Sequence, residues 1–91
     1  MTKLLDTFVS VILIMDEHTY EASERAKKAA FLLKKNYSNY EVLVIDNGIS
    51  REQLSNLRHI LPKVACIRIV RLARTTDIDT AIYAGIEAAI G

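Results

Sequence analysis

An aspartate, Asp46, directly follows a run of four apolar residues, Val42 to Ile45, in the stretch NYSNYEVLVIDNGIS. The run is mostly β-branched and lies between turn-forming residues, which predicts a short strand buried on both faces. Such strands belong to parallel sheets, and open parallel sheets bind ligands at the carboxyl ends of their strands. Gly48 permits a sharp turn after the carboxylate. Asp46 is therefore predicted either to contact a ligand or, because Asp-Asn-Gly forms turns well, to build a purely structural turn.

A second group of charged residues lies at the end of a later strand-like run, Ala65 to Leu72, and just after it. Arg71 and Arg74 could bind a diphosphate bidentately, or they could be charges at an exposed sheet edge that discourage further strand pairing. Asp77-Ile78-Asp79 has the literal pattern of a metal-binding Asp-x-Asp. It stands directly before a helical pattern, however, so a helix cap is the preferred interpretation.

The elements that must position these side chains alternate in type, which predicts a βαβαβα order. Strands are predicted over Phe8 to Met15, Val42 to Ile45 and Ala65 to Leu72, and helices over Tyr20 to Lys35, about Arg51 to Leu61, and from Asp77 or Asp79 onward. Ser50 and Gln53 have the spacing of a capping box before the second helix. The third helix is predicted from an apolar stripe formed by Ile78, Ala81, Ile82, Gly85, Ile86 and Ala89.

Right-handed crossovers would place the three parallel strands side by side, with the first two helices on one face and the third on the other. The first strand is apolar on both sides, yet no fourth strand follows to pair with it. It would therefore be an open edge, and the face under the third helix would be only half covered. We expect the chain to be either a piece of something longer or half of a homodimer that covers this surface.

Composition limits the function. The 91 residues are expected to form a single domain, residues 1–91, and a net charge of +1 gives no field that would favour nucleic acid as a partner. No apolar run is long enough to span a bilayer or to form a convincing secretion signal, so no transmembrane segment and a cytoplasmic location are expected. The single cysteine, Cys66, excludes an internal disulfide and is expected to be a small buried thiol. His18 and His59 fit no metal-ligand pattern, and surface or helix-end roles are expected of them.

The stretches VSVILIMDE, NYSNYEVLVIDNGIS and IRIVRLARTTDIDTAIYAGIEAAIG together resemble the amino-terminal half of a family 2 glycosyltransferase of the GT-A fold. The resemblance covers residues 9 to 91, and its most specific part is the aromatic residue, Glu, four apolar residues and Asp at Tyr40 to Asp46. It implies a Rossmann-like α/β domain, a truncated GT-A nucleotide-binding half with a three-stranded parallel sheet. In that family this half holds a nucleoside-diphosphate sugar donor, usually of uridine or guanosine.

The resemblance also implies a set of nucleotide-binding residues. Met15, Asp16 and Glu17 correspond to the loop that touches the base and ribose. Asp46 corresponds to the aspartate that contacts the nucleoside, and Asn47 to the second aspartate of that pair. Arg71 and Arg74 correspond to an arginine-containing stretch after the third strand, and Asp77 to the start of the third helical segment. The chain departs from the family at several of these places. The family's Pro-x-Tyr-Asn-Glu is replaced by Ile14 to His18, the glycine before the third helix by Asp77, and the asparagine within it by Tyr83.

The family's Asp-x-Asp metal motif and its catalytic base belong to a carboxyl half that these residues do not include. The resemblance therefore implies no catalytic residue, metal site or cofactor within this chain, and a divalent metal (Mn or Mg) only in a complete family member. Two hypotheses stay open. The chain is either a glycosyltransferase-like donor-binding domain that is not catalytically complete, which the order of elements favours, or a freestanding non-catalytic α/β module that homodimerises, which the changed motif positions favour.

Overall fold

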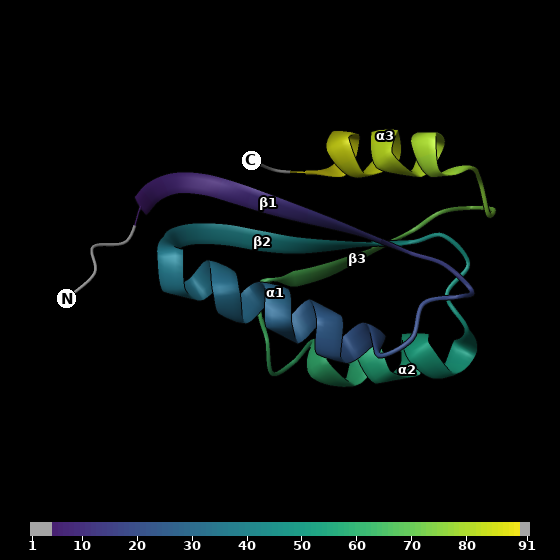
Figure 1. The fold of residues 1–91 in the computed structure, drawn as a ribbon, viewed down its shortest axis with the longest axis horizontal. Coiled ribbons are helices and arrows are strands. Elements are labelled where there is room, and N and C mark those ends of the chain that lie inside the picture. The colour runs from purple at the N-terminus through teal and green to yellow at the C-terminus, as the bar shows by residue number, and fades with distance from the viewer. Residues whose placement is uncertain (1–4, 90–91) are drawn as a thin grey trace.

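The structure is a computed structural model that describes residues 5–89 of the 91-residue chain. In this part of the chain three strands alternate with three helices (Figure 1). The strands are β1 (Leu5–Met15), β2 (Tyr37–Asp46) and β3 (Ile67–Arg71), and the helices are α1 (Ala22–Asn36), α2 (Arg51–Ile60) and α3 (Ile78–Ala88). The predicted α/β class and βαβαβα order are confirmed.

The strands form one parallel sheet in the order β1-β2-β3, so β2 is the central strand. Met15 pairs with Asp46, and Asp46 with Arg71, which brings the carboxyl ends of the strands to one end of the sheet. β2 is longer than the predicted apolar run because its beginning also pairs with β1, from Tyr37 opposite Leu5 onward. Backbone pairing rather than hydrophobicity sets the amino end of this strand.

α1 and α2 cover one face of the sheet and enclose the larger core (Figure 1). Its buried members come from both helices and from every strand: Met15, Ala22, Ala26, Ala30, Leu33, Val42, Val44, Leu57 and Ile67. Tyr37 and Tyr40 pack against this core, as their position at the start of β2 suggested. α1 begins at Ala22 rather than at Tyr20 because Glu21 has a left-handed conformation, with φ 53°, that lies outside the helix.

α3 lies on the opposite face and approaches the sheet through small residues (Figure 1). Ala81 is fully buried, and Gly85 lies so close to β1 that an added Cβ would be 2.7 Å from Ile12 Cγ2. The large residues of the predicted stripe, Ile78, Ile82 and Ile86, are instead 62, 41 and 60% exposed. The stripe predicted the helix correctly, but its buried members are the small residues Ala81 and Gly85. This face of the sheet is thinly covered.

β1 and β3 are the outer strands of the sheet within residues 5–89. β1 pairs with β2 alone, so the open edge predicted for the first strand is present. On β3, Arg68 donates a 2.9 Å hydrogen bond to the backbone oxygen of Ala88 and lies 3.5 Å from the buried carboxylate of Glu41. Arg68 therefore connects the end of α3 to the edge strand β3. No helix of the described residues is long and apolar enough to cross a membrane.

Candidate functional site

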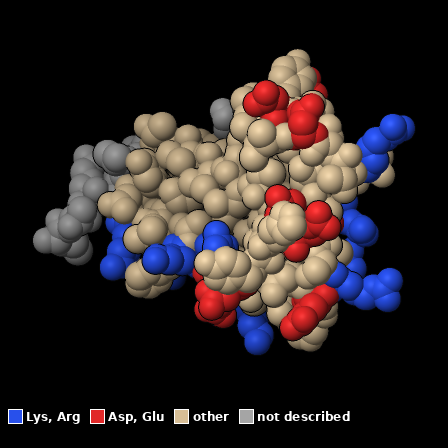
Figure 2. Space-filling model, turned by 45° about the vertical axis from the view of Figure 1, so that its right-hand side comes forward, with Lys and Arg blue, Asp and Glu red and all other residues tan. Residues whose placement is uncertain are grey.

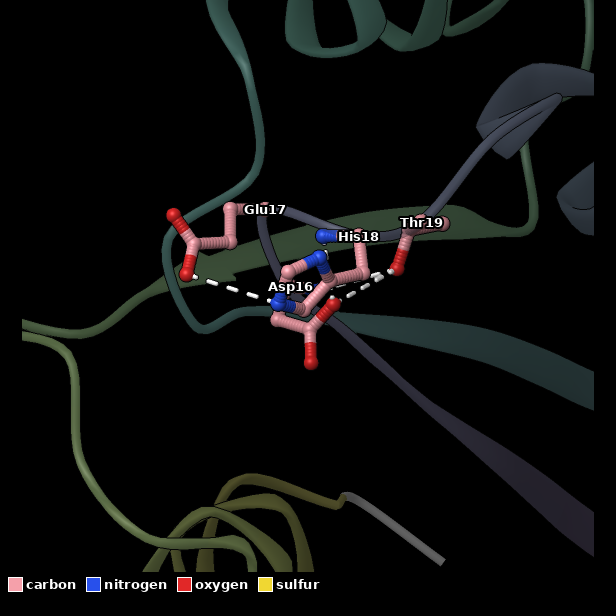
Figure 3. A network of polar contacts seen from close by, with 4 residues as sticks. All are labelled: Asp16, Glu17, His18 and Thr19. Atoms are coloured by element: carbon pink, nitrogen blue, oxygen red, sulfur yellow. Dashed lines mark hydrogen bonds and ion pairs between the residues drawn. The ribbon is translucent and has the colours of Figure 1, made fainter.

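The connection after β1 is a tight turn built around Asp16 and Thr19 (Figure 3). The backbone N–H of Asp16 donates to Thr19 Oγ1 at 2.9 Å, and the backbone N–H of Thr19 donates to the Asp16 carbonyl at 3.1 Å. Asp16 Oδ1 accepts a hydrogen bond from the backbone N–H of His18 at 2.9 Å. The second carboxylate oxygen of Asp16 points away from these partners (Figure 3), so it is available to a ligand.

Glu17 and His18 project from this turn into solvent. Glu17 Oε1 lies 3.5 Å from His18 Nε2, and the two side chains are 77 and 84% exposed (Figure 3). Surface pairs of this kind add little stability because water screens them. The surface role expected of His18 is confirmed, and both side chains can turn toward a bound molecule.

The start of α1 is capped from another helix. Gln53 of α2 accepts a 2.8 Å hydrogen bond at Oε1 from the backbone N–H of Ala22, while its own backbone N–H donates to Ser50 Oγ at 3.3 Å. Only half of the predicted capping box therefore forms, because the Gln53 side chain reaches α1 instead of returning to its own helix. This contact fixes the turn after β1 relative to α2.

Asp46 ends β2 with both carboxylate oxygens engaged inside the protein. Oδ1 accepts hydrogen bonds from the backbone N–H groups of Gly48, at 3.1 Å, and Ile49, at 2.8 Å. Oδ2 lies 3.2 Å from Arg71 Nε in an ion pair, and Asp46 is only 7% exposed. The carboxylate stabilises the turn after β2 and forms an ion pair with Arg71 of β3. Its contact with a nucleoside stays a prediction.

Asn47 joins three segments at the end of the sheet. Its side chain donates from Nδ2 to the Thr76 carbonyl at 2.9 Å and accepts at Oδ1 from the Thr76 N–H at 2.8 Å. Its backbone N–H donates to the Met15 carbonyl at 2.8 Å. An aspartate, which the resemblance implies for this position, could not donate to Thr76 and would set an anionic oxygen against its carbonyl. The asparagine is therefore suited to its local structure.

Gly48 is required by the turn that it occupies. Its φ is +97°, a conformation that L side chains rarely adopt, and an added Cβ would lie 2.9 Å from Thr75 Oγ1. The close approach brings the turn after β2 against the loop between β3 and α3.

These loops enclose a cleft of about 280 Å³ at the carboxyl ends of the strands. It is lined by Asp16, Glu17, His18, Asn47, Gly48, Thr75 and Thr76. Figure 2 brings this end of the molecule forward and shows carboxylates in separate groups over it, with basic side chains toward the margins. Because carboxylates accept hydrogen bonds, the cleft suits hydroxyl and N–H groups of a ligand better than phosphates.

The predicted site residues divide into two groups in the structure. Asp16, Glu17 and Asn47 line the cleft. Met15 and Asp46 lie beneath it, 3 and 7% exposed, and Met15 belongs to the core under α1. Thr75 and Thr76, which sequence reasoning did not identify, complete the cleft wall. The sequence feature that could have identified them is a pair of adjacent hydroxyl residues between the end of a strand and a helix cap.

The remaining predicted residues lie outside the cleft wall. Arg71 is bound to Asp46 through Nε but its side chain is 63% exposed, and Arg74 is exposed. Asp77 caps α3, because its Oδ1 accepts a 2.7 Å hydrogen bond from the backbone N–H of Thr80. This hydrogen bond, with a smaller contribution from the Thr80 hydroxyl, lowers the pKa of Asp77. The interpretation of Asp77-Ile78-Asp79 as a cap is confirmed.

The described side chains of this site do not form a metal centre of their own. Within residues 5–89, no three side chains of His, Cys, Asp or Glu lie close enough together to hold a metal ion. Of the nearby carboxylates, Asp46 is bound to Arg71 and two N–H groups, and Asp77 to the start of α3.

Comparison with known proteins adds no relative. No protein-family model matches the chain, and no curated protein matches it. The resemblance to family 2 glycosyltransferases rests on the quoted residues alone.

Proposed function

We propose that the cleft at the carboxyl ends of the strands binds the nucleoside part of a nucleoside-diphosphate sugar, as the donor-binding half of a family 2 glycosyltransferase does, without catalysing transfer. The observation that supports this best is that Asp16 and Glu17, which follow β1, line one cleft with Asn47, which follows β2. Open α/β sheets bind their ligands at this end.

The groups in the cleft match the chemistry of a nucleoside. The free oxygen of Asp16 and the exposed carboxylate of Glu17 accept hydrogen bonds from ribose hydroxyls or base N–H groups. The exposed His18 ring offers a flat face to a base. A volume of about 280 Å³ is at the small end for a ligand site, so it takes a nucleoside and leaves the phosphates outside.

The phosphates would extend toward Arg71, the last residue of β3, and Arg74, which follows the strand. Arg71 uses Nε for Asp46, which leaves its terminal nitrogens for an anion, and Arg74 is exposed beyond it. Binding is expected to be weak, because Asp16 and Glu17 repel the diphosphate while these arginines attract it.

An amide-proton NMR titration with uridine and guanosine diphosphates, in the presence of magnesium, tests the proposal. Saturable shifts are expected at residues 15–19, 46–49 and 74–77. The double variant Asp16→Asn with Glu17→Gln should weaken binding of uridine or guanosine, which have no phosphate to be repelled, about tenfold, since hydrogen bonds to charged groups contribute about 1.5–3 kcal/mol. Glu52→Gln, which neutralises an exposed carboxylate on α2, is the matched control. An unchanged wild-type spectrum at millimolar nucleotide contradicts the proposal.

Two variants of Asp46 separate its possible roles. Asp46→Asn keeps an oxygen that can accept from Gly48 and Ile49, so it preserves the turn but removes the charge. If Asp46 only builds the turn, this variant binds nucleotide nearly as well as the wild type, whereas Asp46→Ala does not. If the carboxylate contacts the nucleoside, both variants lose binding.

The exposed side of α3 favours a second candidate function, a non-catalytic module that homodimerises through β1. Ile78, Ile82 and Ile86 form an uncovered apolar row on the helix that lies over β1. A two-fold axis perpendicular to the sheet would pair the β1 edges antiparallel and place both α3 helices on the same face. This two-fold arrangement would cover the open β1 edge and bring the two isoleucine rows close together.

Sedimentation velocity tests this second function. The wild type is expected to sediment as a dimer, and Ile86→Glu as a monomer, because a charge would be buried between the helices. Leu32→Glu makes the same change at a leucine on α1 that is 52% exposed, and it should leave the dimer intact. A monomeric wild type at high micromolar concentration contradicts dimerisation.

A further inference from the structure

A second and larger cleft, of about 500 Å³, lies at the other end of the sheet. It is formed by one side of α1, the start of β2 and the loop from α2 to β3, which Figure 1 shows returning beside α1. Its lining residues are Lys27, Ala30, Phe31, Lys34, Tyr40, Lys63, Val64, Ala65 and Cys66. Tyr40 precedes Asp46 by six positions on β2, about 20 Å along a strand, so this cleft is separate from the nucleoside cleft.

The walls of this amino-end cleft are apolar and aromatic. Ala30 and Tyr40 pack on the core beneath it, while Phe31 is 59% exposed at its rim. Lys35 lies over the Phe31 ring, 4.7 Å from the centroid, and so holds the ring in place from its outer side. The volume falls within the range of sites that bury a drug-sized organic molecule.

The charged side chains that line the cleft are all lysines. Lys27 is neutralised by Glu24 at 3.0 Å, but Lys34 and Lys63 have no carboxylate partner within the described residues. These two ammonium groups come from different walls, one from α1 and one from the loop before β3. Among the side chains that the structure describes, no carboxylate lines the cleft. An apolar site with two unpaired ammonium groups is complementary to an anion that has an apolar body.

We propose that the amino-end cleft binds a small organic anion with an aryl-sized apolar body, which Lys34 and Lys63 hold by its charged group while Phe31 and Tyr40 contact its rings. This cleft is lined by lysines and takes an anion, whereas the cleft at the carboxyl ends of the strands is lined by carboxylates. It does not depend on nucleotide binding.

Cys66 provides a reporter at this site, because it lines the cleft and is the single cysteine of the chain. Cys66 is half-buried rather than buried as predicted, but this partial burial raises the pKa of the thiol, so alkylation at neutral pH is expected to be slow but measurable. An anion beside the thiol would raise the pKa further and would also block access to the sulfur. Ligand binding should therefore slow alkylation.

The experiment uses 8-anilinonaphthalene-1-sulfonate, a fluorescent aryl anion, and N-phenyl-1-naphthylamine, its neutral counterpart without the sulfonate. The anion is expected to bind saturably and to slow iodoacetamide alkylation of Cys66 at least fivefold. The double variant Lys34→Glu with Lys63→Glu should weaken binding of the anion at least tenfold, because it replaces two attractions by two repulsions. Binding of the neutral compound should change less than twofold.

Two control variants make the result specific. Lys28→Glu with Arg51→Glu changes the net charge equally at exposed positions outside the cleft and should leave binding of the anion unchanged. Ile86→Ser removes part of the exposed apolar row of α3, where the dye could also adhere, and should have no effect on Cys66 protection. Circular dichroism melts verify that each variant is folded.

Three outcomes would overturn the proposal. The first is no saturable binding of the aryl anion to the wild type. The second is equal weakening by the two charge-reversal pairs, which would show a general charge effect. The third is an alkylation rate of Cys66 that saturating anion does not change, which would place the dye elsewhere.

Discussion

The two faces of the sheet are covered in different ways. Under α1 and α2, side chains such as Leu33, Val44 and Leu57 fill a continuous core. Under α3, the contact consists of small residues, and polar bonds fasten the helix near both ends: Asn47 to Thr76 before its start, and Arg68 to Ala88 at its end. The first face is stabilised by apolar burial, whereas the second combines close backbone approach with polar attachments.

The largest effect is expected from truncation on the α1 and α2 face. Leu57 is fully buried, so Leu57→Ala should reduce the free energy of unfolding by about 2–5 kcal/mol through lost burial and a residual cavity. Ile82→Ala on α3 removes a side chain that is 41% exposed and should cost much less, about 0.5–1.5 kcal/mol. Urea unfolding followed by circular dichroism measures both. Equal losses would contradict the contrast between the faces.

The element types and their order could be predicted from the sequence because they depend on local patterns. Runs such as Val42 to Ile45 predict buried strands, and the cap at Asp77 follows from the residue type directly before a helical pattern. The stripe on α3 was also visible in the sequence. Which of its members face the sheet was not, because that depends on how closely Gly85 lets the helix approach Ile12.

The site was predictable only as far as the strand ends locate it. That rule indicated Asp46, whereas Asp16, Glu17 and Asn47 were named by the resemblance to family 2 glycosyltransferases. Neither the rule nor the resemblance could show that Asn47 bonds to Thr76, or that Gln53 of α2 caps α1, because each contact joins segments about 30 residues apart and depends on tertiary packing. The larger cleft at the opposite end has no sequence motif at all.

The next largest effect concerns the attachment before α3. Asn47→Ala removes both side-chain bonds to Thr76, and the cost should be about 1–3 kcal/mol because the Thr76 N–H and carbonyl lose their partner in a half-buried place. If α3 depends on this attachment, hydrogen exchange should accelerate most in residues 76–88. A uniform acceleration that includes β2 would show instead that Asn47 supports the whole domain.

A smaller change is expected at the contact between α3 and β1. Gly85→Ala adds a Cβ at 2.7 Å from Ile12 Cγ2, which costs about 1–3 kcal/mol in strain. Alanine also favours the helix by about 1 kcal/mol relative to glycine, so the net loss should be about 0–2 kcal/mol. Ile12→Ala removes the obstructing Cγ2, so in urea unfolding Gly85→Ala should cost less when it is added to Ile12→Ala than when it is added to the wild type, provided that Ile12 Cγ2 is what obstructs the new methyl group.

The smallest effect should appear in the pH dependence of α3. The hydrogen bond from the Thr80 backbone lowers the pKa of Asp77 in the folded protein. The unfolded chain therefore binds the proton more tightly, and the cap contributes its stability in full above the ordinary aspartate pKa of about 4. That contribution is lost as the pH falls from there through the lowered folded pKa. Asp77→Asn keeps an oxygen acceptor at the cap but cannot titrate. The difference in melting temperature between this variant and the wild type should therefore narrow as the pH falls from 5 to 2. A difference that is constant over this range would mean that the carboxylate charge contributes nothing to the start of α3.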